Sequence, residues 1–155
     1  MNILKILYEF SGCTKKCEFA EITGSSRDSV YNWINGKGNQ RYLNMMYILD
    51  AYKMTMYLRN PKGDEFLAYP NSTREVFEYI YKNSGYKTRK AMYDDLGISY
   101  KLAMQWHNEM QNPMLDTFQK IVFSFGYEIV FRKESNGMIE EISISCPINR
   151  TCKGA

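Results

Sequence analysis

The hydrophobic residues in the first half of the chain recur with a helical period and then switch to the alternation of strands. Apolar residues spaced three and four positions apart begin at Ile3, and Ser11-Gly12 interrupts this first stretch. Ser26 precedes the third stretch in the position of a helix N-cap, and Asn35-Gly36 ends it. We therefore expect helices over about 3–10, 15–23, 26–35 and 42–52, followed by a hairpin with strands at 55–59 and 65–69.

The second half of the chain has the same order of elements. Ser72-Thr73-Arg74-Glu75 has the form of a capping box, which predicts a new helix after Pro70 has broken the preceding structure. This helix is expected over 73–84, and further helices over 88–96, 99–110 and 113–125. The Asn136-Gly137 pair, flanked by strand-like residues, predicts a hairpin with strands at 127–133 and 138–145.

The chain matches itself without a gap when it is shifted by 73 residues. The identical pairs are Tyr8/Tyr81, Ser11/Ser84, Gly12/Gly85, Gly24/Gly97, Ser26/Ser99, Trp33/Trp106, Asn35/Asn108, Asn39/Asn112, Ile48/Ile121 and Arg59/Arg132. A repeat of fixed period predicts a duplicated structural unit. We expect an α+β fold, mainly α, of two tandem units that each have four short helices and a β-hairpin. The units are expected at residues 1–69 and 70–146, with a flexible tail at 147–155.

Composition narrows the class of protein without identifying a function. The chain has 155 residues, of which 45% are hydrophobic and 24% charged, as in a globular protein. It has no apolar run of about 18 residues that would span a membrane and no leader for secretion, so we expect a cytoplasmic protein. The net charge of +3 is too small to indicate nucleic-acid binding by itself. The 13 tyrosines and 10 methionines suit adaptable packing or contact surfaces.

The cysteines and the single histidine do not indicate an enzyme or a metal site. Cys13 and Cys17 are spaced C-x3-C, and Cys146 and Cys152 are spaced C-x5-C, which is not the spacing of a zinc site. We expect reduced thiols, with a disulfide or a metal site as the alternative. His107 has no paired nucleophile, and the sequence lacks a phosphate-binding loop or a paired-carboxylate motif. No enzymatic activity, cofactor or metal is therefore expected.

One segment of the first half resembles the helix-turn-helix of the phage repressor family, the Cro- and cI-like (XRE) regulators. Within the twenty residues 16–35, the family has a small fifth residue, Gly ninth, and apolar residues fifteenth and eighteenth. Ala20, Gly24, Val30 and Trp33 occupy these positions. The small residue lets two helices cross closely, the glycine turns the chain with a positive φ, and the apolar residues hold the second helix on the first.

A segment of the second half resembles the same motif less closely. Residues 89–108 supply Tyr93, Gly97, Ala103 and Trp106 at the four positions. Tyr93 departs from the small residue that the family has at the close crossing of the two helices. Trp106, like the tryptophan of the first unit, is expected to lie in the core.

The resemblance implies a set of DNA-contacting residues in each unit, because this motif lays the start of its second helix in the major groove. In the first unit the candidates for base edges are Ser26, Arg27, Asp28, Tyr31, Asn32 and Asn35, and those for phosphates are Lys15, Lys16, Lys37 and Arg41. In the second unit they are Ser99, Tyr100, Lys101, Gln105 and Asn108, with Met104 on the same face, and Lys87, Arg89 and Lys90 for phosphates. Arg27 is suited to guanine and Asn32 to adenine.

Two functions are consistent with these patterns. The resemblance implies a sequence-specific, double-stranded DNA-binding transcriptional regulator of phage or bacterial type, with the first unit in the major groove. A homodimer formed through the β-hairpins is expected with it, and no membrane partner. The alternative is a protein-binding module that reuses the repressor fold, such as a phage-encoded inhibitor of a host nucleoprotein of the anti-CRISPR type. The modest charge and the less polar face around Tyr100 and Met104 favour that alternative.

Overall fold

The computed structural model describes residues 2–37 and 40–146, and over this part of the chain the expected α+β class is confirmed. About half of the chain is helical. The described helices are α1 (Ile3–Ser11), α2 (Lys16–Thr23), α3 (Arg27–Ile34), α4 (Tyr42–Ala51), α5 (Thr73–Lys82), α6 (Arg89–Asp95), α7 (Tyr100–His107) and α8 (Leu115–Ser124). The strands are β1 (Thr55–Arg59), β2 (Glu65–Tyr69), β3 (Glu128–Ser135) and β4 (Met138–Ile144). None of these helices is long and apolar enough to cross a membrane. The tail expected at 147–155 lies outside the described residues.

Local sequence signals account for where these elements begin and turn. The hydroxyl groups of Ser26, Ser72 and Ser99 each accept a hydrogen bond from the backbone N–H three residues later, as N-caps do. Asn136 and Gly137 both have positive φ, at 54° and 76°, in the turn between β3 and β4. This backbone matches the twist of a hairpin, which explains why Asn-Gly predicts one.

The two hairpins join into one antiparallel sheet with the strand order β2-β1-β3-β4. β1 pairs with β3 so that Tyr57 lies opposite Val130, its own equivalent 73 residues later. On either side of this pair, Thr55 lies opposite Arg132 and Arg59 lies opposite Glu128. Each residue of β1 therefore pairs with β3 in the same way as its equivalent in β3, 73 residues later, pairs with β1. The pairing has an internal two-fold axis that passes between Tyr57 and Val130.

A second contact between the halves obeys the same symmetry. An isolated antiparallel bridge joins Arg41, just before α4, to its equivalent Met114, just before α8. The N–H of Tyr42 donates to the carbonyl of Pro113 at 3.0 Å, and the N–H of Leu115 donates to the carbonyl of Gln40 at 2.6 Å. Donor Tyr42 corresponds to donor Leu115, and acceptor Gln40 to acceptor Pro113, each 73 residues apart. The axis that crosses the sheet therefore also relates the starts of α4 and α8.

The hydrophobic core runs across the boundary between the halves. The Phe118 ring of α8 packs edge-on against Tyr42 of α4, with 4.8 Å between the ring centroids, and it also meets Phe77 of α5 at 6.3 Å. All three side chains are almost fully buried, as are Leu58 of β1 and Phe131 of β3. The predicted division at residues 69 and 70 therefore falls within a shared core and sheet.

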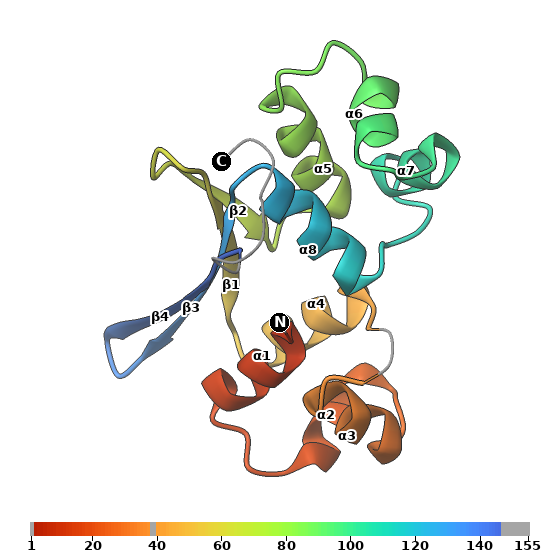
Figure 1. The fold of residues 1–155 in the computed structure, drawn as a ribbon. Helices are drawn as coiled ribbons and strands as arrows, with labels where there is room; N and C mark the ends of the chain where they lie inside the picture. The colour runs from red at the N-terminus through yellow and green to blue at the C-terminus, as the bar shows by residue number, and fades with distance from the viewer. Residues whose placement is uncertain (1, 38–39, 147–155) are drawn as a thin grey trace.

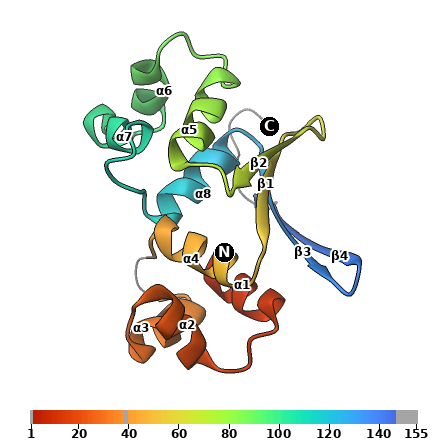
Figure 2. The same cartoon turned by 180° about the vertical axis from the view of Figure 1, so that it is seen from behind.

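Four of the helices form two pairs, α2–α3 and α6–α7, one from each half (Figure 1). Seen from the front and from behind, the pairs lie at opposite ends of the molecule (Figures 1 and 2). In both views they lie on the side away from the hairpins. The sheet and the bridge thus hold two helix pairs apart in a fixed relation.

Because the core is shared, we expect the described halves to unfold together. Phe118→Ala removes a buried ring that contacts both halves and should lower the free energy of unfolding by about 3–5 kcal/mol. Tyr47→Ala, at a ring 45% exposed, is the control and should have a much smaller effect. Denaturant unfolding followed by far-UV circular dichroism should show one transition for wild type and variant. Two transitions, with only one moved by Phe118→Ala, would contradict a shared core.

Candidate nucleic-acid interface

The two helix pairs have the same backbone construction at their turns. At the end of α2, Gly24 has a φ of 69°, and the N–H of Ser25 donates to the carbonyl of Ala20 at 3.0 Å. After α6, Gly97 has a φ of 72°, and the N–H of Ile98 donates to the carbonyl of Tyr93 at 2.9 Å. A left-handed residue is needed at this point, and glycine adopts that conformation without strain. The capping serine of the next helix follows two residues later in both halves.

In the first half, α3 buries one side and exposes the residues predicted for base contacts. Val30, Trp33 and Ile34 are buried, which confirms Trp33 as a core residue. The exposed residues are Ser26, Arg27, Asp28, Tyr31, Asn32 and Asn35. Ser26 is also the N-cap of α3, and its hydroxyl accepts from the N–H of Ser29 at 3.1 Å. The structure therefore brings this predicted set together along one helix.

Of the cations predicted for phosphates in this half, Lys16 lies against a residue of this face and the other three are exposed. Lys15, Lys37 and Arg41 are exposed, and Lys16 places its ammonium 4.2 Å from the centre of the Tyr31 ring. Among the described residues, none of these cations or Arg27 forms an ion pair with a carboxylate. Lys15 is the N-cap residue of α2 and makes no side-chain capping bond. The start of α2 therefore has two lysines and no side-chain cap, and its first turn also has the carboxylate of Glu18.

The second half places its predicted residues in the same arrangement with different chemistry. The exposed ones are Lys87, Lys90, Ser99, Tyr100, Lys101 and Asn108, and the half-exposed ones are Arg89, Met104 and Gln105. The face of α7 also exposes 40% of Leu102. The start of α6 is capped, because the hydroxyl of Thr88 accepts from the N–H of Ala91 at 3.1 Å. This surface exposes more apolar side chains, and the first helix of the pair has a side-chain N-cap, which α2 lacks.

A chain of hydrogen bonds beneath α7 has no equivalent in the first half. The Tyr93 hydroxyl lies 2.6 Å from Nε2 of His107, and Nδ1 of His107 lies 2.7 Å from Glu78. The Glu78 carboxylate also accepts from the guanidinium of Arg89, with a shortest distance of 2.7 Å. At the equivalent positions the first half has Lys5, Lys16, Ala20 and Ile34. Tyr93 thus occupies the small-residue position of the motif because its hydroxyl has a partner in His107.

The pKa shifts of His107 and Glu78 determine which atoms of this hydrogen-bond network carry protons. Burial lowers the pKa of His107 and outweighs the opposing effect of its hydrogen bond to Glu78, so the imidazole is neutral at pH 7. Burial alone would raise the pKa of Glu78, but its hydrogen bonds with Arg89 and His107 lower it, so it is a carboxylate. Neutral His107 therefore donates from Nδ1 to Glu78 and accepts at Nε2 from Tyr93.

This network also determines what two predicted phosphate ligands do in the structure. Arg89 is held by Glu78 and lies over the Tyr81 ring, 4.8 Å from its centre. Lys90 pairs with Asp94, four residues later on the same helix, at 2.7 Å. Among the phosphate candidates of the second half, Lys87 alone has no ion pair with a described residue. Sequence analysis missed the network, although the departure at Tyr93 and the single histidine were its visible signals.

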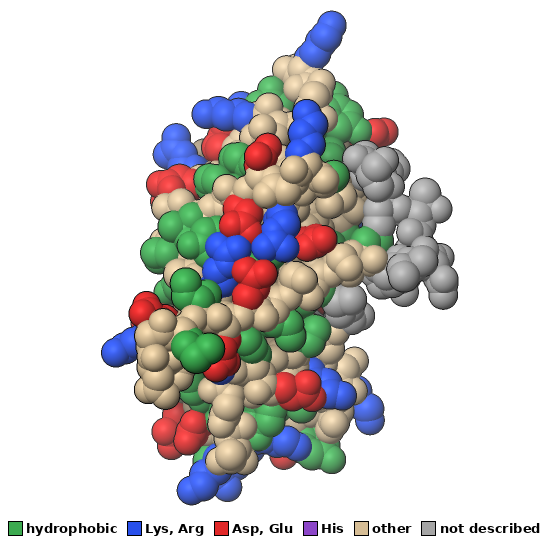
Figure 3. All heavy atoms as spheres, turned by 90° about the vertical axis from the view of Figure 1, so that its left-hand side faces the viewer, with side chains coloured by type: hydrophobic (Ala, Val, Ile, Leu, Met, Phe, Trp, Pro, Cys, Tyr) green, Lys and Arg blue, Asp and Glu red, His purple; other side chains and the backbone are tan. Residues whose placement is uncertain are grey.

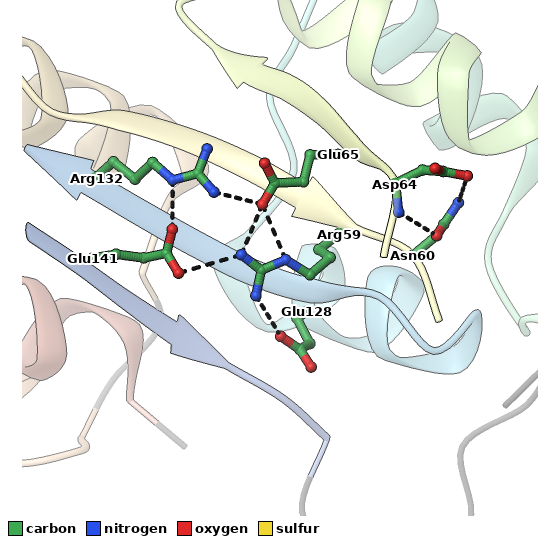
Figure 4. Close-up of polar contacts among 7 residues, drawn as sticks. All are labelled: Arg59, Asn60, Asp64, Glu65, Glu128, Arg132 and Glu141. Atoms are coloured by element: carbon green, nitrogen blue, oxygen red, sulfur yellow. Dashed lines mark hydrogen bonds and ion pairs between the residues drawn. The ribbon is translucent and has the colours of Figure 1, made fainter. Parts of the chain in front are cut away.

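The hairpin side of the molecule has a different electrostatic character. Arg59 and its equivalent Arg132 both pair with Glu65 and Glu141, and Arg59 also approaches Glu128 at 3.4 Å (Figure 4). Arg132, followed by Arg59, lowers the pKa of Glu65 through hydrogen bonds. Figure 3 shows positive and negative side chains interleaved at the centre of this side. Its charges neutralise one another, so it is not the cationic surface that a phosphate backbone needs.

The described cysteines and carboxylates do not form a metal centre. No group of three or more His, Cys, Asp or Glu in the described residues is placed to hold a metal ion. Cys13 and Cys17 are free, and burial raises the pKa of the Cys13 thiol. Cys146 is disulfide-bonded, so the expectation of reduced thiols is wrong for that residue.

The network predicts a specific dependence of stability on pH. Since the pKa of folded His107 lies below its ordinary value, only the unfolded chain gains a proton as the pH falls below about 6.5. Stability is therefore fully present above this pH and decreases below it, by at most about 1.4 kcal/mol per pH unit. His107 is the only histidine, so His107→Gln should flatten the profile between pH 7 and 5. Urea unfolding across this range measures it, and an equal slope in both proteins would contradict the assignment.

Comparison with known proteins adds no family name to this arrangement. No protein-family model, no curated protein and no solved structure matches the chain. The resemblance to phage repressors therefore rests on the residues of the two helix pairs alone.

Proposed function

We propose that this protein is a sequence-specific double-stranded DNA-binding regulator whose two helix pairs are tandem helix-turn-helix units. The single observation that carries the proposal is the internal two-fold axis, which relates two helix pairs with exposed second helices. The backbone of duplex DNA has two-fold symmetry at every base-pair step. Proteins that read it with this motif place two recognition helices about one helical turn, or 34–36 Å, apart. A chain with its own two-fold axis supplies both helices at once.

The first unit has the side chains that direct reading of bases requires. Arg27 stands at the first position of α3, exposed and with no ion pair among the described residues, so its fork is available to O6 and N7 of guanine. Asn32 lies five residues further along the helix and is suited to adenine. The uncapped start of α2, with Lys15 and Lys16, meets the phosphate backbone beside the groove.

The pairing of the two hairpins within one chain bears on the expected homodimer. β1 and β3 use their inner edges on each other within one chain, so a second chain is not needed to supply a second recognition helix. A homodimer formed through the hairpins would have to use β2 or β4, the strands at the edges of the sheet. We therefore propose that one chain is the DNA-binding unit.

The alternative function, protein binding, is favoured by one observation on the second unit. Tyr100 and Leu102 are 41% and 40% exposed on α7, and Arg89 and Lys90 are paired with carboxylates. An apolar helix face with neutralised cations suits a protein partner better than phosphates. An inhibitor of a host nucleoprotein, of anti-CRISPR type, would use such a face. We expect such an inhibitor to bind a protein partner and to show no strong preference among duplex DNA sequences.

DNA binding can be tested with a pool of randomised duplexes, because the operator sequence is unknown. We expect selection to recover a preferred site, and Arg27→Ala to weaken binding to it by about 1–3 kcal/mol and relax one base position. Lys37→Ala should weaken binding to all sequences and reduce the slope against log salt by about one. Lys62→Ala, in the turn between β1 and β2, is the matched control and should change neither.

Two outcomes would refute the proposal. In the first, the chain binds no duplex even at low salt, where phosphate contacts are strongest. In the second, it binds all duplexes alike and Arg27→Ala retains wild-type affinity and specificity. Either outcome would direct attention to the face of α7 and to a protein partner.

A further inference from the structure

We propose that the DNA site is asymmetric, with two different half-sites in a fixed order, and that a single chain fills it. This inference rests on the proposed function and names its substrate more closely. A homodimer reads two half-sites with identical helices and therefore prefers a palindrome. Here the backbone has the two-fold symmetry, but the side chains on its two recognition helices differ.

Four of the differences between α3 and α7 fall on exposed or half-exposed positions. At equivalent positions 73 residues apart, Arg27 corresponds to Tyr100, Asp28 to Lys101, Tyr31 to Met104, and Asn32 to Gln105. The pair at 28 and 101 reverses the sign of the charge. The flanking positions are identical, with serine at 26 and 99 and asparagine at 35 and 108. The N-cap and C-cap residues of the two helices are therefore identical, while these four positions between them differ.

These substitutions change which bases each helix suits. The α3 set combines the guanidinium of Arg27 with the amide of Asn32, which are suited to guanine and adenine. The α7 set brings Tyr100 and Met104, whose apolar surfaces suit the methyl group of thymine, together with Lys101 and Gln105. One half-site should therefore require a guanine opposite Arg27, and the other should be richer in thymine. Because the sheet register and the bridge that relate the two halves are symmetric, we assign this difference to the side chains of the two helices.

We also expect the two units to bind the phosphate backbone with unequal strength. Around α3 the described cations have no carboxylate partner, and the start of α2 has no side-chain cap. Around α7, Glu78 holds Arg89, Asp94 holds Lys90, and Thr88 caps α6. The first unit should therefore supply most of the salt-dependent affinity, and the second unit should add discrimination by base contacts. This inequality gives the chain a defined orientation on its site.

The test makes the two helices alike. Tyr100→Arg, Lys101→Asp, Met104→Tyr and Gln105→Asn together give α7 the reading set of α3, and all four side chains are exposed or half-exposed. The reciprocal variant, Arg27→Tyr, Asp28→Lys, Tyr31→Met and Asn32→Gln, gives α3 the set of α7. Each purified protein is used to select sites from the same pool of randomised duplexes. Thermal unfolding verifies that each variant is folded, and sedimentation gives the number of chains per duplex.

We expect the wild type to select a non-palindromic site and to bind it with one chain per duplex. Inverting one half-site should weaken binding by about 10- to 100-fold. The first variant should select a palindrome built from the α3 half-site, and the reciprocal variant a palindrome built from the other half-site. If one variant does not fold, the other still reports on symmetry.

Three results would overturn the inference while leaving DNA binding intact. They are a palindromic site for the wild type, two chains bound to one site, and a site in which only the bases beneath α3 are specified. The last would indicate that α7 faces something other than DNA. Failure to select any site would instead contradict the proposed function itself, so the two failures are distinguishable.

Discussion

The antiparallel pairing of β1 with β3 is the contact on which the arrangement of the molecule depends. Each hairpin alone has two strands, which are marginal in water, and their pairing produces a four-stranded sheet with a buried face. The register, with Tyr57 opposite Val130, sets the two-fold axis. The bridge between Arg41 and Met114 repeats the axis on the helical side. These two contacts, together with the shared core, relate the two helix pairs to each other.

The two halves follow a similar backbone path with different side chains at equivalent positions. The left-handed position at residue 36 is glycine and its equivalent at 109 is glutamate, and the one at 53 is lysine where its equivalent at 126 is glycine. The same path is thus followed by different residues. In the interior, the second half replaces Ala20 and Ile34 with Tyr93 and His107, and a hydrogen bond between the new pair satisfies both buried groups. The tyrosine and the histidine that the second half buries are therefore hydrogen-bonded to each other.

Much of the local structure was predictable from sequence. The helix starts at Ser26, Ser72 and Ser99 and the turn at Asn136-Gly137 follow from interactions among residues that are close in the chain. The candidate interface was predictable in part, because helical spacing alone places Arg27 and Asn32 on the solvent side of α3. The interactions of Arg89 were not predictable, since its partner Glu78 comes from another helix, eleven residues away in the sequence.

The sequence by itself determined the repeat, the order of helices and strands, and the residues exposed on each second helix. Short-range hydrogen bonds and hydrophobic periodicity encode these features, and both can be read along the chain. Only the tertiary structure decided that the two hairpins pair with each other and that the helix pairs are related by an internal two-fold axis. Strand edges are interchangeable in hydrogen bonding, so a sequence that specifies two hairpins does not specify which edges meet. That choice depends on the shared core, where residues such as Tyr42 and Phe118 from different halves come into contact.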